Sequence, residues 1–186
     1  MVFLSFLPLI VFPVVSGFFT VASGIFAALA ASIIVLSIDR QLSGGSVKVL
    51  NLGAFVVFAI LAAIDAIVHP VWNDLWVRLA INLSFFGIVL WGIVTHRPFT
   101  LQYARRQVPK EMWTSPVFLQ TNDRITTAWA GAFLVGVIVD VVRIYVPGVP
   151  PWLDSTLVIG SLVVAGWFTS WYPKYVRAKY APISSR

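Results

Sequence analysis

The chain lacks cysteine and carries little charge. Without cysteine, its 186 residues have no disulfide bonds, thiolate metal sites or cysteine nucleophiles. Charged residues make up only 11% of the sequence and hydrophobic residues 59%, whereas a soluble domain has about 25% charged residues. This composition is typical of an integral membrane protein. No Lys or Arg precedes Arg40, so the N-terminus lacks the positive region of a signal peptide and we expect it to be retained.

Common catalytic motifs are also missing. The sequence contains no H-E-x-x-H, no glycine-rich phosphate loop and no G-x-S-x-G. The two histidines, His69 and His96, are expected at opposite membrane faces, where they cannot share a metal ion. We therefore expect no catalytic residues, no metal, no cofactor and no enzymatic activity. An enzyme acting through Asp65, His69 and Asp140 stays the minor alternative.

Long apolar runs dominate what is present. A helix needs about 20 apolar residues to cross a ~30 Å hydrocarbon core. Five runs reach that length, at residues 18–38, 52–69, 75–95, 125–146 and 153–172. We predict an all-α, polytopic transmembrane helical bundle that forms one integral membrane domain. The predicted order is three spans in residues 18–95, a basic cytoplasmic loop at 96–124, two spans in 125–172 and a basic cytoplasmic tail at 173–186.

The apolar segment at residues 1–17 is ambiguous. It continues into the first span without a charge, and a single helix over both would be too long for a bilayer. Pro8, Pro13 and the Ser16-Gly17 pair are the available helix breakers. The segment is therefore predicted to be a sixth span, a re-entrant helix or an interfacial helix.

Basic residues predict the orientation. Eleven of the thirteen Lys and Arg residues fall in segments that the span pattern puts on one side, and the positive-inside rule makes that side cytoplasmic, with the C-terminus inside. Since these cations flank apolar spans, we expect anionic lipid headgroups, not nucleic acid, as their partners. A plain juxtamembrane anchor without a specific ligand is the alternative. The candidate interface residues are Arg97, Arg105, Arg106, Lys174, Arg177 and Lys179.

Six polar residues fall within the predicted spans or at their outer ends. They are Asp65, His69, Arg78, Asn82, Asp140 and Arg143. Asp65 precedes His69 by four residues and Asp140 precedes Arg143 by three, so each pair shares a helical face. Charges in a membrane need partners, and we expect the six side chains to face one another in an outer layer. That cluster is interpreted as a proton- or cation-coupled site, as a headgroup-binding pocket open to the outside, or as an ion-pair and hydrogen-bond clasp that fixes helix register.

The N-terminal run Phe-Leu-Ser-Phe-Leu-Pro-Leu-Ile-Val-Phe at residues 3–12, with the alanine-rich span after it, resembles the bacterial septation protein A family, the inner-membrane YciB proteins. The span ending in His69, the Leu-Trp-Val-Arg stretch at 75–78 and the polar run before Trp129 extend the resemblance. The His-Pro-Val-Trp turn, the loop at 99–105 and the basic tail depart from it, which indicates a divergent member.

The resemblance implies a multi-pass protein of the bacterial inner membrane that serves septation and cell-envelope maintenance. It implies partners among division or cell-wall synthesis membrane proteins and offers no catalytic residues to carry over. A homo-oligomer is a further possible assembly. The alternative function is a small proton- or cation-coupled transporter or channel that uses the Asp/His/Arg cluster.

Overall fold

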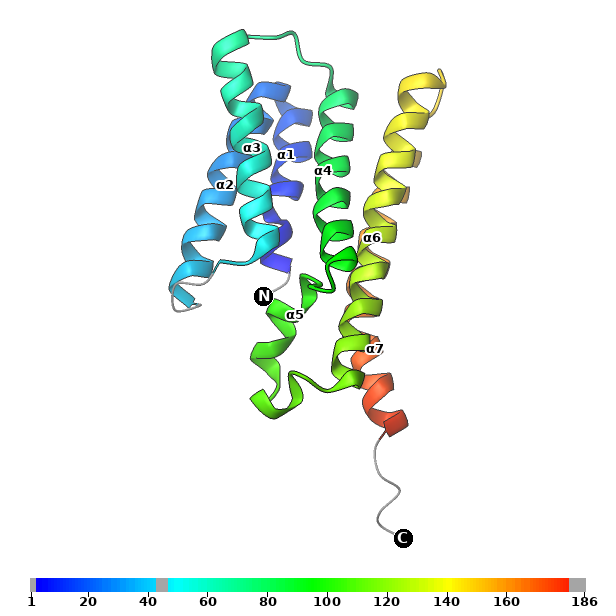
Figure 1. The fold of residues 1–186 in the computed structure, drawn as a ribbon. Coiled ribbons are helices and arrows are strands. Elements are labelled where there is room, and N and C mark those ends of the chain that lie inside the picture. The colour runs from blue at the N-terminus through cyan, green and yellow to red at the C-terminus, as the bar shows by residue number, and fades with distance from the viewer. Residues whose placement is uncertain (1–2, 43–46, 181–186) are drawn as a thin grey trace. The chain divides into compact units, whose positions relative to one another are not determined.

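The computed structural model describes residues 3–42 and 47–180, and this part of the chain is helical with no strand. Seven α-helices and three short 3-10 helices follow one another along it (Figure 1). The α-helices are α1 (Leu7–Phe18), α2 (Val21–Leu42), α3 (Val49–Val68), α4 (Asp74–Val94), α5 (Thr100–Ala104), α6 (Pro116–Tyr145) and α7 (Pro151–Tyr180). The 3-10 helices are η1 (Phe3–Phe6), η2 (Arg105–Gln107) and η3 (Lys110–Met112).

Five of these helices, α2, α3, α4, α6 and α7, are long and apolar enough to cross a membrane. They correspond to the five predicted spans, and the predicted class of helical membrane protein is confirmed. The chain divides within α4 into two compact units, Met1–Ile88 and Val89–Arg186. Each unit is described by itself.

In the first unit, α1 to α4 run in alternating directions, with α1 packed along α2 and α2 along α3 (Figure 1). Gly24 makes the α1–α2 approach possible. A Cβ on Gly24 would lie 2.8 Å from Ser16 Cβ and 2.9 Å from the Phe12 carbonyl oxygen, closer than side-chain atoms tolerate. Phe12 is 3% exposed, and its ring centroid lies 6.1 Å from that of Phe58 in α3.

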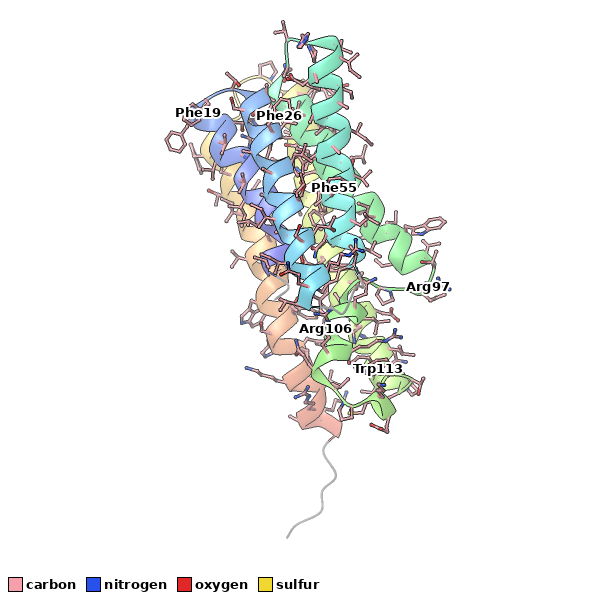
Figure 2. The ribbon with its side chains drawn as sticks, turned by 90° about the vertical axis from the view of Figure 1, so that its left-hand side faces the viewer. Phe19, Phe26, Phe55, Arg97, Arg106 and Trp113 are labelled. Atoms are coloured by element: carbon pink, nitrogen blue, oxygen red, sulfur yellow. The ribbon has the colours of Figure 1, made fainter. Side chains whose placement is uncertain are left out.

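The N-terminal segment therefore forms a short apolar helix that packs lengthwise against α2. At about 1.5 Å per residue, the twelve residues of α1 extend about 18 Å, short of the ~30 Å core. Aromatic side chains such as Phe19 and Phe26 project outward from this pair (Figure 2).

In the second unit, α6 and α7 form an antiparallel hairpin. The Trp129 indole N–H donates to Thr169 Oγ1 at 2.9 Å, and Ser161 Oγ donates to the Ala132 carbonyl at 3.3 Å. These two bonds tie the helices together at two levels. Among the five long helices, α6 is the most buried and α7 the least.

The connector between α4 and α6 is folded where the sequence suggested only a basic loop. Phe99, which precedes the short helix α5, is buried, and so are Leu101 and Tyr103 within that helix. Thr100 Oγ1 lies 3.0 Å from the Asn122 carbonyl and 2.8 Å from Thr126 Oγ1, which fastens α5 to α6. Residues Arg106 and Trp113 lie farther along this connector (Figure 2).

Candidate functional site

Two of the polar residues predicted in the first unit, Asp65 and Arg78, have partners close by in the chain. The Trp72 indole N–H donates to Asp65 Oδ1 at 2.6 Å, and Asp65 is half-buried. His69 instead ends α3 as a left-handed cap, with φ 48° and ψ 52°, and its side chain is exposed. Because the helical geometry stops at Val68, the four-residue spacing does not bring the imidazole to the carboxylate.

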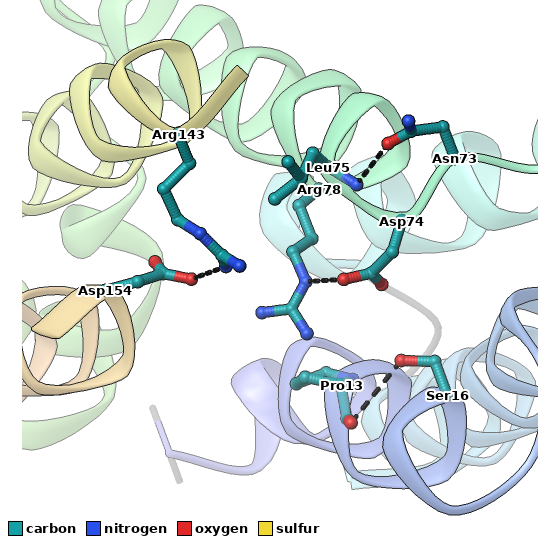
Figure 3. A network of polar contacts seen from close by, with 8 residues as sticks. All are labelled: Pro13, Ser16, Asn73, Asp74, Leu75, Arg78, Arg143 and Asp154. Carbon is teal, nitrogen blue, oxygen red and sulfur yellow. Dashed lines mark hydrogen bonds and ion pairs between the residues drawn. The ribbon is translucent and has the colours of Figure 1, made fainter. Parts of the chain in front are cut away.

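Arg78 pairs within its own helix. Its Nε donates to Asp74 Oδ2 at 2.6 Å, one turn earlier in α4 (Figure 3). Asn73 caps the start of α4, since its Oδ1 accepts the Leu75 backbone N–H at 3.0 Å. Asn82 lies one turn beyond Arg78 on the same face and is half-buried.

In the second unit, Arg143 forms an ion pair with Asp154 across the turn between α6 and α7 (Figure 3). Asp154 is 3% exposed and the Arg143 side chain 18%. Asp140, one turn before Arg143, is 1% exposed inside α6. The spacing rule had joined Arg143 to Asp140, and the pairing with Asp154 depends on a turn whose geometry the sequence does not specify.

A third polar cluster, which sequence analysis missed, closes the α2–α3 turn. The Lys48 ammonium forms an ion pair with Asp39, and the Lys48 backbone N–H also donates to Asp39 Oδ2 at 2.9 Å. Asn51 Nδ2 donates to the same oxygen at 3.0 Å, and all three residues are at least 93% buried. The signal available was an acid and a base nine residues apart at the ends of consecutive spans.

The six cations predicted at the lipid interface are all exposed. Arg97 projects from the connector (Figure 2), and the Arg105 guanidinium lies 5.3 Å from the ring centroid of Trp113. That tryptophan donates its indole N–H to the Arg105 carbonyl at 3.1 Å, which holds the connector in a closed loop. Lys174, Arg177 and Lys179 lie on the last two turns of α7.

No group of three or more His, Asp and Glu residues in the described part of the chain could hold a metal ion. The described residues form ion pairs and hydrogen bonds at helix ends, place one buried carboxylate in α6 and give the α6–α7 hairpin a cationic end. The chain is thus a multi-pass helical membrane protein. Comparisons with protein-family models, curated proteins and solved structures found no match.

Proposed function

We propose that the chain is a scaffold of the bacterial inner membrane that serves division and envelope maintenance by binding other membrane proteins. Its C-terminus lies in the cytoplasm, and it performs no catalysis. The observation that carries the proposal is the local pairing of its charges. The Arg78 guanidinium is paired within α4 and the Arg143 guanidinium across the turn between α6 and α7, and such local ion pairs serve to hold helices in place.

The outer surface of α7 supports the same reading. Val163, Val164 and Trp167 are each about 60% exposed on this helix, and α7 is the least buried of the long helices. An apolar, poorly covered helix is suited to lateral contact with another transmembrane helix. The basic residues at its end suit the anionic headgroups of the cytoplasmic leaflet. The resemblance to septation proteins suggests the class of partner, namely division or cell-wall synthesis membrane proteins.

Site-specific photo-crosslinking from α7 tests the proposal. A photoreactive residue at Val164, which is 61% exposed, is expected to form adducts with division or cell-wall synthesis membrane proteins in living bacteria. The same residue at Ala165, which is 2% exposed, is the matched internal control and is expected to form none. Adducts with lipid alone from both positions would refute the scaffold; adducts with a second copy would assign that surface to a homo-oligomer instead.

The transporter or channel is kept as a second candidate because of Asp140. A carboxylate that is 1% exposed within a membrane-spanning helix is costly and often functional. Reconstitution in liposomes separates the two functions. Proton or cation flux that disappears in Asp140→Asn would establish transport, whereas absence of flux together with specific crosslinks would establish the scaffold.

A further inference from the structure

A polar pocket of about 230 Å³ lies between α6 and α7 at their basic end. Its polar lining consists of Gln120, Thr121 and Arg124 from α6 and Tyr172, Tyr175 and Lys179 from α7. The α6 residues recur at helical spacing and so form one face. Among the residues that the structure describes, two cations line the pocket and no carboxylate does. Such a lining favours an anion.

The lengths of the two helices place this pocket at the level of the membrane surface. Each contains thirty residues, or about 45 Å at ~1.5 Å per residue, against a ~30 Å hydrocarbon core. Both therefore project about ten residues beyond it. The pocket residues belong to the projecting ends, at the N-terminal side of α6 and the C-terminal side of α7.

The aromatic wall of the pocket is held in place by stacking along α7. Tyr175 stacks on Trp171 with ring centroids 5.3 Å apart, and Tyr172 stacks on Phe168 at 4.8 Å. Trp171 in turn stacks on Trp167 at 5.3 Å. Rings supported in this way lose little freedom when a ligand binds, so their hydroxyl groups are preorganised.

The lining matches the chemistry of a phosphate ester. A guanidinium binds phosphate oxygens in bidentate fashion, an ammonium adds a second positive charge, and tyrosine hydroxyls and a glutamine amide donate hydrogen bonds. The Thr121 hydroxyl is already engaged, because it donates to the Val117 carbonyl at 2.7 Å. A volume of 230 Å³ is below the ~300 Å³ at which drug-sized ligand sites begin, so the pocket suits a headgroup and not a whole lipid or nucleotide.

We propose that this pocket is a binding site for an anionic phosphate ester, held by Arg124 and Lys179 between the tyrosines of α7. A lipid headgroup and a soluble phosphate ester share this chemistry. For a lipid, the acyl chains would continue along the exposed apolar surface of α7 at Val164 and Trp167. The site needs only the membrane hairpin and is independent of the scaffold function.

The test compares two double variants with the same loss of charge. Arg124→Gln/Lys179→Gln removes the cations of the pocket, and Lys174→Gln/Arg177→Gln removes two neighbouring cations of α7 that do not line it. The full chain in detergent is titrated with phosphatidylglycerol, with phosphatidylcholine as the neutral lipid, and bound lipid is counted by native mass spectrometry. Each cation near an anionic lipid contributes about fivefold in affinity, so the pocket variant is expected to bind phosphatidylglycerol about thirtyfold more weakly. The control also removes two cations expected at the lipid interface, but they do not line the pocket, so its loss is expected to stay below the roughly fivefold that a single bound cation contributes.

Glycerol phosphate distinguishes the two sources of ligand. If it binds the wild-type chain and displaces the lipid, the ligand is a soluble ester; if only the lipid binds, the ligand is a headgroup. Equal loss in both double variants, no loss in either, or equal binding of phosphatidylcholine would overturn the site.

Tyr172→Phe/Tyr175→Phe removes only hydroxyl groups and keeps the stacked rings, so a measurable loss of phosphatidylglycerol binding is expected there too. Circular dichroism confirms that each variant is folded.

Discussion

Replacing Arg143 with alanine is expected to destabilise the α6–α7 hairpin strongly. The substitution leaves the Asp154 carboxylate 97% buried and without its cation. Breaking a buried ion pair from one side costs about 3–5 kcal/mol. Since the Arg143 side chain is 18% exposed, part of that cost is relieved by water, and we expect a loss of about 2–3 kcal/mol in the free energy of unfolding.

Arg78→Ala is the matched control for this prediction. Arg78 also pairs with an aspartate, but within one helix, and the two side chains are 27% and 38% exposed. An exposed pair one helical turn apart contributes about 0.3–0.5 kcal/mol. The two variants remove the same kind of side chain and the same charge, so the difference between them reports what burial and the link between two helices add.

The absence of cysteine makes a local assay possible. A single cysteine in place of Val139, which is buried in α6, is labelled by a thiol reagent only when the hairpin opens. A loss of about 2 kcal/mol should raise the labelling rate about thirtyfold in Arg143→Ala and less than about threefold in Arg78→Ala. Global stability is followed in parallel by circular dichroism during titration with a denaturing detergent. Equal effects of the two variants would refute the reasoning, because the Arg143–Asp154 pair would then be no more protected from water than a surface pair.

Three further predictions concern the first unit and are measured by the same detergent titration. Gly24→Leu is expected to lower the free energy of unfolding by about 1–3 kcal/mol because the new side chain would collide with α1. Gly87→Leu is the control and should be neutral or stabilising, since nothing lies within 4 Å of that position. Equal effects of the two variants would contradict the close approach of α1 and α2. Asp39→Asn keeps the shape of the side chain but leaves the buried Lys48 without its anion, so we expect the free energy of unfolding to fall by about 3 kcal/mol. A neutral result would mean that this cluster is open to water. Trp72→Phe removes the donor to Asp65, a charge-assisted bond worth about 1 kcal/mol at a half-buried site; full stability in the variant would show that water replaces the indole.

Hydropathy predicted the long helices well because burial in lipid imposes one length on every span. It did not predict their ends. α6 begins at Pro116, nine residues before the predicted span, and α7 continues past Pro173 to Tyr180. Polar residues are compatible with a helix once it leaves the hydrocarbon core, so hydropathy falls while the helix continues. Pro173 removes one backbone hydrogen bond near the membrane surface, where water can satisfy the freed carbonyl.

The polar residues show a different limit of sequence reasoning. Six of them were grouped into one layer from their depth in the spans and from their helical spacing. The spacing argument requires that the helix continues through both residues of a pair. His69 lies where α3 ends, so its four-residue spacing brings its backbone N–H to the Asp65 carbonyl but does not pair the two side chains. Asp154 was not among the six, although the short turn between α6 and α7 brings it to Arg143.

Sequence separation explains why the charges do not require an assembled cluster. Asp39 and Lys48 are nine residues apart, Arg143 and Asp154 eleven, and Asp65 and Trp72 seven. Each contact closes one turn between consecutive elements, at little cost in loop entropy. A helical hairpin that satisfies its own polar groups can enter the bilayer without waiting for the rest of the fold. Asp140 differs, because it lies within the body of α6 and not at a turn, and for that reason it is the residue on which the choice between scaffold and transporter depends.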